Sequence, residues 1–181
     1  IAAILGLDDA GIDAACAEAA QGEIVQPANF NAPGQVVIAG HASAVQRAME
    51  AAKAKGAKRA IVLPMSIPAH CLLMKPAALQ FGPRLTATQL KLPQPRVLQN
   101  ATLRYAASET ELKQALIDQI YNPVRWAATV KAFADEGVTQ LIECGPGKVL
   151  TPLAKRIDER IAGVSLHDLA SLEAALTQMQ S

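Results

Sequence analysis

The first 64 residues alternate between short apolar runs and amphipathic stretches, a pattern typical of a small mixed fold. Four runs predict strands: residues 1–6, 24–30, 35–39 and 60–63. The second and third runs are separated by Asn-Ala-Pro-Gly at 31–34. Proline presets φ and glycine tolerates a positive φ, so these two runs are expected to form a hairpin.

Two amphipathic stretches predict helices between these strands. The apolar positions at helical spacing are Ile12, Ala15, Cys16 and Ala19 in the first stretch and Val45, Ala48, Met49 and Ala52 in the second. Asp8 or Asp9 is expected to cap the first helix and Ser43 the second. The predicted order is β-α-β-β-α-β, which is the ferredoxin-like arrangement of two helices on one face of an antiparallel sheet.

The remaining residues predict strands that alternate with helices, which favours a parallel sheet. Strands are expected at 96–100, 138–143 and 164–166, and helices at 72–89, 108–121, 124–136, from the 145–147 turn to about 161, and 168–179. The first of these helices is expected to be interrupted at Gly82-Pro83. Three strands leave a parallel sheet with poorly covered edges, so further strands are expected to complete it.

Composition excludes several classes of protein. The chain has 181 residues, of which 51% are hydrophobic, 18% charged and 3% aromatic, and the formal net charge is +1. This composition is typical of a globular protein and argues against a surface built for nucleic acid or membrane. The chain opens at Ile1 in an apolar run, without Met. We therefore expect it to be a piece of a longer protein.

The cysteines do not predict a metal site. Cys16, Cys71 and Cys144 are widely spaced, and the sequence has no C-x-x-C pair and no Cys/His ligand spacing. We expect three reduced thiols and no metal.

His70 is the candidate general base, because it lies in a loop after a predicted strand. An ordinary surface histidine is the simpler alternative. No serine occupies a Gly-x-Ser-x-Gly elbow, and the side chain of the adjacent Cys71 is expected to point away from His70. From the residues alone, the chain offers a base without a nucleophile.

Two further features each allow two interpretations. Gly145-Pro146-Gly147-Lys148 fails the phosphate-loop pattern, so a plain strand-to-helix turn is favoured over an anion site at free helix N–H groups. A basic cluster around Gly56 predicts either a solvated helix end or a docking patch for an acidic partner. Its members are Lys53, Lys55, Lys58 and Arg59.

Six segments, taken together, show a family resemblance. They are LGLDD at 5–9, NFNAPGQVVIAGH at 29–41, GAKRA at 56–60, SIPAHCLLMKP at 66–76, QIYNPVRW at 119–126 and ECGPGKVLT at 143–151. In this order and spacing they resemble the malonyl-CoA:acyl-carrier-protein transacylases of fatty-acid synthesis. The resemblance covers nearly the whole chain.

The resemblance implies an α/β fold in two parts. Residues 1–64 would be a ferredoxin-like small subdomain, and residues 65–181 the C-terminal part of an α/β-hydrolase-like core. The N-terminal half of the family is not matched by these residues. That half carries the Gly-His-Ser-x-Gly nucleophile, the arginine that pairs with the malonyl carboxylate and a glutamine of the oxyanion hole.

The resemblance also implies roles for individual residues. His70 would be the base of a ping-pong Ser-His mechanism, and the backbone carbonyl of Gln119 would accept a hydrogen bond from it. Asn29, Asn31 and Gln35 would lie on the hairpin that lines the cleft between subdomains.

Further implied roles concern substrates and partners. Gly147 and Val149 would lie beside the pantetheine channel, and Lys58 and Arg59 would face the acidic acyl carrier protein. The implied partners are acyl carrier protein, malonyl-CoA and the missing N-terminal half, in the cytoplasm, without cofactor, metal, nucleic acid or membrane. Two alternatives stay open: an acyltransferase domain of a polyketide synthase, or a non-catalytic module that binds carrier protein or coenzyme A.

Overall fold

The computed structural model describes residues 1–179. Its contacts form two compact units, Ile1–Trp126 and the residues from Ala127 on. This division differs from the boundary expected after residue 64, because the segment up to Trp126 is bonded to the N-terminal sheet. The smaller subdomain boundary therefore stays a prediction within the first unit.

Four antiparallel strands form the sheet of the first unit, in the order β2-β3-β1-β4. Their bounds are Ala2–Leu5 for β1, Val25–Ala32 for β2, Gln35–Gly40 for β3 and Arg59–Val62 for β4. Helices α1, Asp9–Ala20, and α2, Ala42–Ala54, connect them. The observed order β-α-β-β-α-β is the one that the apolar pattern predicts.

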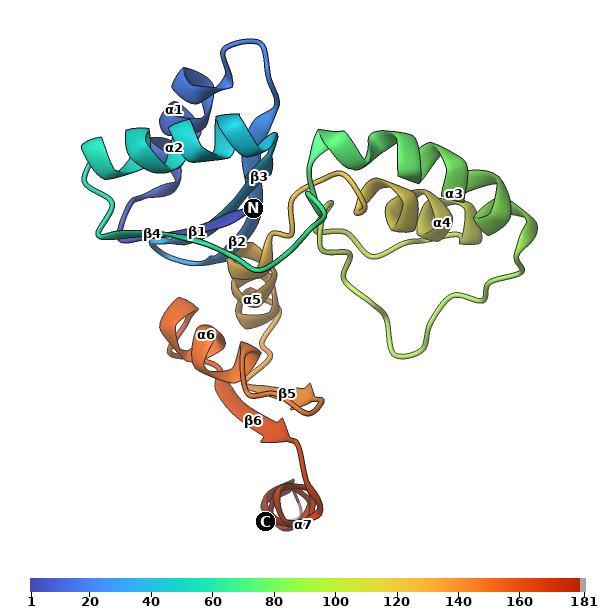
Figure 1. The fold of residues 1–181 in the computed structure, drawn as a ribbon. Helices are drawn as coiled ribbons and strands as arrows, with labels where there is room; N and C mark the ends of the chain where they lie inside the picture. Colours follow the sequence, from blue (N-terminus) through green and yellow to red (C-terminus); the bar gives the residue numbers. More distant parts are fainter. Residues whose placement is uncertain (180–181) are drawn as a thin grey trace. The chain divides into compact units, whose positions relative to one another are not determined.

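The two faces of this sheet are covered differently (Figure 1). On one face, Ile4 and Ile38 are 1% exposed and pack with the apolar sides of α1 and α2. On the other face, Val37 and Ala39 pack with Cys71, which is fully buried. The residue that follows His70 is therefore anchored in the core beneath the sheet.

The remainder of the first unit carries two helices that lie side by side (Figure 1). After a 3-10 turn at Leu72–Met74, α3 spans Lys75–Ala87 and α4 spans Glu109–Asp118. Helix α3 passes through Gly82-Pro83 without the expected interruption. The Lys113 ammonium of α4 donates to the Thr86 carbonyl of α3 at 2.9 Å, which ties the two helices together.

The second unit contains α5, Trp126–Asp135, which begins at the last residue of the first unit, followed by β5, α6, β6 and α7. Strand β5 spans Gln140–Cys144, α6 spans Leu150–Ile157, β6 spans Ala162–Leu166 and α7 spans Leu169–Met179. Strands β5 and β6 are parallel, with Ile142 opposite Val164. The parallel pairing is confirmed, but within the described residues this sheet has two strands rather than three.

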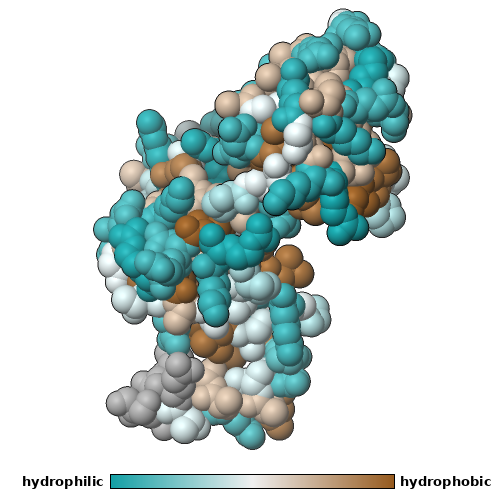
Figure 2. All heavy atoms as spheres, turned by 90° about the vertical axis from the view of Figure 1, so that its left-hand side faces the viewer, coloured by the Kyte–Doolittle hydropathy of each residue, from teal (hydrophilic) through white to brown (hydrophobic). Residues whose placement is uncertain are grey.

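Hydrophilic side chains cover much of the face shown in Figure 2, with smaller apolar patches between them. The first unit also exposes large apolar side chains: Ile61, Val62, Met65, Ile67, Leu72, Leu79 and Phe81. Leu79 is 66% exposed and Val62 is 61% exposed. None of the helices described between residues 1 and 179 has the length and apolarity required to cross a bilayer.

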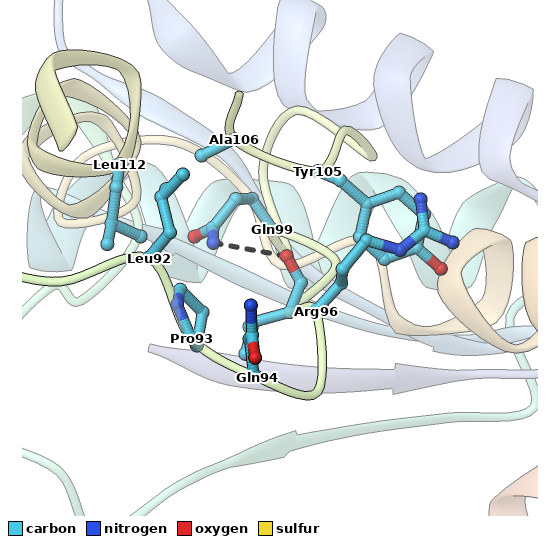
Figure 3. Close-up of a pocket in the computed structure, with 9 residues that line it drawn as sticks. Leu92, Pro93, Gln94, Arg96, Gln99, Tyr105, Ala106 and Leu112 are labelled. Atoms are coloured by element: carbon cyan, nitrogen blue, oxygen red, sulfur yellow. Dashed lines mark hydrogen bonds between the residues drawn. The ribbon is translucent and has the colours of Figure 1, made fainter. Parts of the chain in front are cut away.

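The strand expected at 96–100 is not formed. Only Leu98 bridges to Tyr105, because the chain reverses at once through a turn closed by the Leu103 N–H and the Gln99 carbonyl at 2.9 Å. The segment instead lines a cavity of about 180 Å³ (Figure 3). There the Arg96 guanidinium stacks 4.1 Å from the Tyr105 ring centre. None of the predicted site residues lines this cavity.

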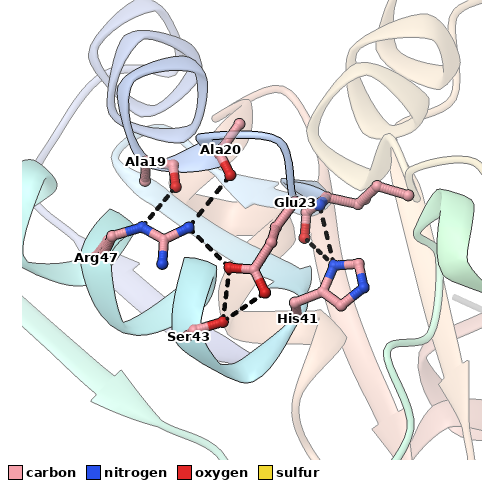
Figure 4. Close-up of polar contacts among 7 residues, drawn as sticks. Ala19, Ala20, Glu23, His41, Ser43 and Arg47 are labelled. Carbon is pink, nitrogen blue, oxygen red and sulfur yellow. Dashed lines mark hydrogen bonds and ion pairs between the residues drawn. The ribbon is translucent and has the colours of Figure 1, made fainter.

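One of the two predicted helix caps is confirmed and the other is wrong. Asp8 caps α1 as expected, accepting the Gly11 N–H at 2.8 Å. The prediction for Ser43 is wrong: His41 is the N-cap residue of α2, and the Ser43 hydroxyl donates to the Glu23 carboxylate at 2.7 and 2.8 Å (Figure 4). A hydrogen bond to a charged carboxylate is stronger than one between neutral groups, so Glu23 orients the Ser43 side chain.

Candidate active site

His70 lies in the loop between β4 and the 3-10 turn, with its backbone in the left-handed region at φ +60°. For a residue other than glycine this conformation costs roughly 1–3 kcal/mol, so neighbouring contacts must hold it. The His70 N–H donates to the Ile120 carbonyl at 3.2 Å. The ring nitrogen Nδ1 lies 2.8 Å from the Gln119 carbonyl oxygen.

The contact with Gln119 determines which nitrogen of the neutral His70 ring carries the hydrogen. A carbonyl oxygen only accepts hydrogen bonds, so Nδ1 must carry the proton. In the neutral ring the lone pair then resides on Nε2. The hydrogen bond that the family resemblance implies is thus present, and the half-buried ring has the tautomer that a general base requires at Nε2.

The turn that follows α4 presents this carbonyl. The Asp118 carbonyl accepts the Asn122 side-chain amide at 2.8 Å and the Asn122 N–H at 3.1 Å. The Tyr121 hydroxyl donates to Asp118 Oδ1 at 2.8 Å, and this hydrogen bond raises the pKa of Tyr121. The sequence alone assigns no role to Asp118, which precedes Gln119, or to Tyr121, which lies in the segment 119–126 that carries the resemblance.

Strand β2 holds the other end of the same segment. The Val124 N–H donates to the Ala28 carbonyl and the Phe30 N–H donates to the Val124 carbonyl, both at 2.9 Å. The helix expected from Val124 therefore begins only at Trp126, because the Val124 backbone is engaged with the sheet. Asn29 forms a parallel bridge with Val124, which places it beside the segment that carries Gln119.

The other hairpin residues lie farther along the same strands. Asn31 is near the end of β2, and Gln35 begins β3 opposite Ala32 and Leu5. Both side chains are half-buried. Their roles in binding stay predictions.

Cys71 is placed to anchor rather than to react. Its side chain is fully buried beneath the sheet, and burial raises the pKa of its thiol. A thiol with a raised pKa is a poor nucleophile at neutral pH. The next residue is fixed as well, since the Leu72 N–H donates to Gln26 Oε1 at 3.3 Å.

Lys58 and Arg59 lie at the start of β4, and both side chains are exposed. The Lys58 N–H donates to the Leu5 carbonyl at 2.8 Å, and the Lys58 stem packs over Gly6. Within the same basic cluster, Lys55 forms an ion pair with Glu18 at 2.9 Å. Backbone hydrogen bonding at the start of β4 thus holds Lys58 and Arg59 in place, with their two charged side chains exposed.

Glu143 controls the loop that contains Gly147 and Val149 in the second unit. Its carboxylate accepts the N–H groups of Val149, Leu150 and Thr151 at 2.8 to 3.0 Å. Burial raises the pKa of Glu143, but these bonds outweigh it and lower the pKa to about 2. The favoured interpretation of this segment, a plain strand-to-helix turn, is therefore confirmed, and the alternative anion site is excluded because Glu143 already accepts these N–H groups.

Gly147 and Val149 are both exposed, and the Gly147 carbonyl accepts the Ser165 hydroxyl at 3.4 Å. The structure brings His70 and Gln119 together in the first unit, where Asn29 pairs with Val124, whereas Gly147 and Val149 belong to the second unit. Among residues 1–179, no group of three or more His, Cys, Asp or Glu side chains is placed to hold a metal ion.

Curated proteins are similar in sequence to this chain over nearly all of its residues. The malonyl CoA-acyl carrier protein transacylase of Salmonella typhimurium is 49% identical over 178 residues, which are 98% of this chain and 58% of the relative. That of Bacillus subtilis is 39% identical over 181 residues, covering 99% of this chain and 57% of the relative. No family model matches the chain.

Solved structures agree with the fold. A malonyl-transacylase in complex with a type II PKS acyl-carrier protein superposes with a TM-score of 0.96 at 49% identity, covering 98% of this chain and 57% of that one. An acyl carrier protein S-malonyltransferase from Vibrio cholerae gives 0.94 at 50% identity, covering 96% and 57%. Over nearly all of its residues the chain is thus a homologue of the malonyl CoA-acyl carrier protein transacylases, and it spans somewhat more than half of their length.

Proposed function

We propose that this chain supplies the general base of a malonyl-CoA:acyl-carrier-protein transacylase. The observation that carries the proposal is the 2.8 Å contact between His70 Nδ1 and the Gln119 carbonyl, which directs the ring lone pair to Nε2. In a Ser-His-Asp triad an aspartate performs this orienting task. Here a neutral carbonyl fixes the tautomer of the ring.

In the proposed reaction Nε2 serves both half-reactions. It takes the proton of a serine hydroxyl while that oxygen attacks the malonyl thioester, and it returns the proton to the departing coenzyme A thiolate. The phosphopantetheine thiol of acyl carrier protein then gives its proton to Nε2 and attacks the malonyl ester. The serine oxygen leaves with that proton, which regenerates the starting state.

We propose that the serine comes from polypeptide equivalent to the part of the relatives that this chain does not span. Two features support this. Neighbouring residues of β4 and the loop after it, Ile61, Val62, Met65 and Ile67, all expose large apolar side chains, as a surface covered by further polypeptide would. Strands β5 and β6 form a parallel pair, whereas parallel sheets are normally larger and covered on both faces.

The finer description of the fold belongs to the same proposal. The sheet order β2-β3-β1-β4 with α1 and α2 on one face supports a ferredoxin-like small subdomain in residues 1–64. Residues 65–181 would contribute the C-terminal part of an α/β-hydrolase-like core. A cytoplasmic location follows from the proposed reaction and suits the free cysteines.

Substrate contacts are assigned to the surfaces described above. Asn29, Asn31 and Gln35 would line the cleft, and Gly147 and Val149 would lie beside the pantetheine channel. The exposed pair of Lys58 and Arg59 would attract the acidic carrier protein.

One finding supports a second kind of acceptor, a carrier protein of polyketide synthesis. A neighbour with a TM-score of 0.96 is a malonyl-transacylase solved with a type II PKS acyl-carrier protein. The same chemistry would then load a carrier protein of polyketide synthesis. Comparing transfer rates to carrier proteins of the two kinds decides between them.

Reconstitution tests the proposal. The segment of the Salmonella typhimurium relative that this chain does not match is produced separately and mixed with residues 1–181, malonyl-CoA and phosphopantetheinylated carrier protein. Mass spectrometry of the carrier protein should show the malonyl adduct only when both polypeptides are present. A stable complex of the two polypeptides that transfers no malonyl group would contradict the proposal.

A further inference from the structure

The turn from Asp118 to Asn122 delivers two carbonyl groups to one histidine. The Gln119 carbonyl accepts His70 Nδ1–H at 2.8 Å, and the Ile120 carbonyl accepts the His70 N–H at 3.2 Å. Successive carbonyl groups reach one residue only if the turn keeps a fixed conformation. Since the His70 backbone is in the left-handed region, both contacts also hold an unfavourable conformation.

The Tyr121 side chain closes this turn. Its hydroxyl donates to Asp118 Oδ1 at 2.8 Å, so the side chains on either side of Gln119 and Ile120 are bonded to each other. The contact is partly buried, and a hydrogen bond to a charged acceptor in such a place is stronger than a neutral one. The bond therefore restricts rotation of the peptide groups between Asp118 and Tyr121.

Tyr121 also touches the chain segment that carries His70. The ammonium of Lys75 lies 6.0 Å from the centre of the Tyr121 ring, and Lys75 is the first residue of α3. Only the Cys71 anchor and the 3-10 turn separate Lys75 from His70. One side chain thus contacts both segments whose alignment places His70 against Gln119.

We propose that Tyr121 is a positioning residue for the His70–Gln119 pair. Through its bond to Asp118 it holds the Gln119 carbonyl in line with Nδ1 and thereby selects the Nδ1–H tautomer of His70. This proposal rests on the proposed function for its significance, because the tautomer matters for a base that acts through Nε2. Its geometry is a property of residues 1–181 alone.

The test measures the tautomer of His70 directly. Nitrogen chemical shifts of the imidazole, recorded by NMR on the 15N-labelled chain at a pH where the ring is neutral, give the ratio of Nδ1–H to Nε2–H forms. A hydrogen bond of this kind is worth about 1 kcal/mol, so Tyr121→Phe should lower the ratio about fivefold. The matched control is Tyr105→Phe, which removes the hydroxyl of a tyrosine outside the turn and should leave the ratio unchanged.

Variants of Asp118 make the test independent of tyrosine packing. Asp118→Asn keeps a neutral, weaker acceptor for the Tyr121 hydroxyl and should lower the ratio less than Asp118→Ala does, whereas Asp118→Ala should resemble Tyr121→Phe. The double variant with Asp118→Ala and Tyr121→Phe should be no worse than either single variant, as expected for partners in one bond. The backbone amide spectrum of each variant verifies that it is folded.

Three outcomes would overturn the proposal. An unchanged ratio in folded Tyr121→Phe would show that the turn holds itself. A loss in Asp118→Asn as large as in Asp118→Ala would show that the acceptor is not what matters. A wild-type chain without the Nδ1–H form would contradict the proposed function as well, whereas the first two outcomes leave that function standing.

Discussion

Glu143 offers a quantitative prediction, because its carboxylate stabilises the start of α6 from inside the protein. It accepts three backbone N–H groups and the Thr151 hydroxyl, the last at 2.8 Å, and it is 9% exposed. The N-terminus of a helix also favours a negative charge. Replacing the carboxylate by the amide in Glu143→Gln removes the charge and points an NH2 group at an N–H donor.

The magnitude follows from the pKa of this group. Hydrogen bonds lower the pKa of Glu143 from an ordinary 4.5 to about 2. Each pKa unit corresponds to about 1.36 kcal/mol, so the ionised form contributes about 3 kcal/mol at pH 7. Because the pKa is lower in the folded state, this contribution is complete above pH 5 and declines as the pH falls toward 2. At pH 3 about 1.5 kcal/mol should be left.

Amide exchange of Val149, Leu150 and Thr151 measures this effect locally. After correction for the intrinsic exchange rate, the ratio of exchange in Glu143→Gln to that in the wild type should be large at neutral pH. It should shrink steadily between pH 5 and pH 3. A ratio that stays constant over this range would refute the assignment of the stabilisation to the carboxylate charge. Equal exchange at neutral pH would refute the stabilisation itself.

Two other predictions concern the first unit. In the reconstituted enzyme, the pair Lys58→Glu and Arg59→Glu should slow transfer to carrier protein and leave loading from malonyl-CoA intact. Equal slowing of both half-reactions would contradict a docking role. Asp8→Ala should lower the free energy of unfolding by about 1 kcal/mol through loss of the α1 cap, measured by urea denaturation. A change below about 0.3 kcal/mol would contradict that role.

The fold of residues 1–64 follows from the sequence because each element there is specified locally. A continuous apolar run predicts β3, helical spacing predicts α1, and the Asp8 cap needs only the N–H of Gly11 three residues later. The failure at Ser43 has the opposite cause. Its hydroxyl binds Glu23, which lies 20 residues earlier in the chain, and no local pattern contains that contact.

Other elements depend on contacts that sequence spacing does not describe. Val124 has the pattern of a helix start, but its backbone is bonded to Ala28 and Phe30 of β2. The strand-to-helix turn at 145–147 is predicted from the sequence, but the hydrogen bonds by which Glu143 of the preceding strand accepts the following N–H groups are not. At Val124 tertiary hydrogen bonds override the local expectation, and at Glu143 a hydrogen-bonding partner is added that local spacing does not indicate.

Part of the candidate site can also be predicted from the sequence. Position alone selects His70 as a loop histidine, and the resemblance adds Gln119, whose role is played by a backbone carbonyl that any residue type carries. Residue identity therefore could not reveal this partner. Tyr121 and Asp118 escape sequence reasoning for a related reason, since a turn-closing bond leaves no periodic pattern.

The central claim is that His70 acts as the general base through Nε2. The most direct measurement is the rate of malonyl transfer to carrier protein by the reconstituted enzyme with His70→Ala, beside the control His167→Ala. Loss of a general base predicts a fall of about 10²- to 10⁴-fold for His70→Ala and a wild-type rate for the control. A His70→Ala rate within a few-fold of wild type would contradict the claim.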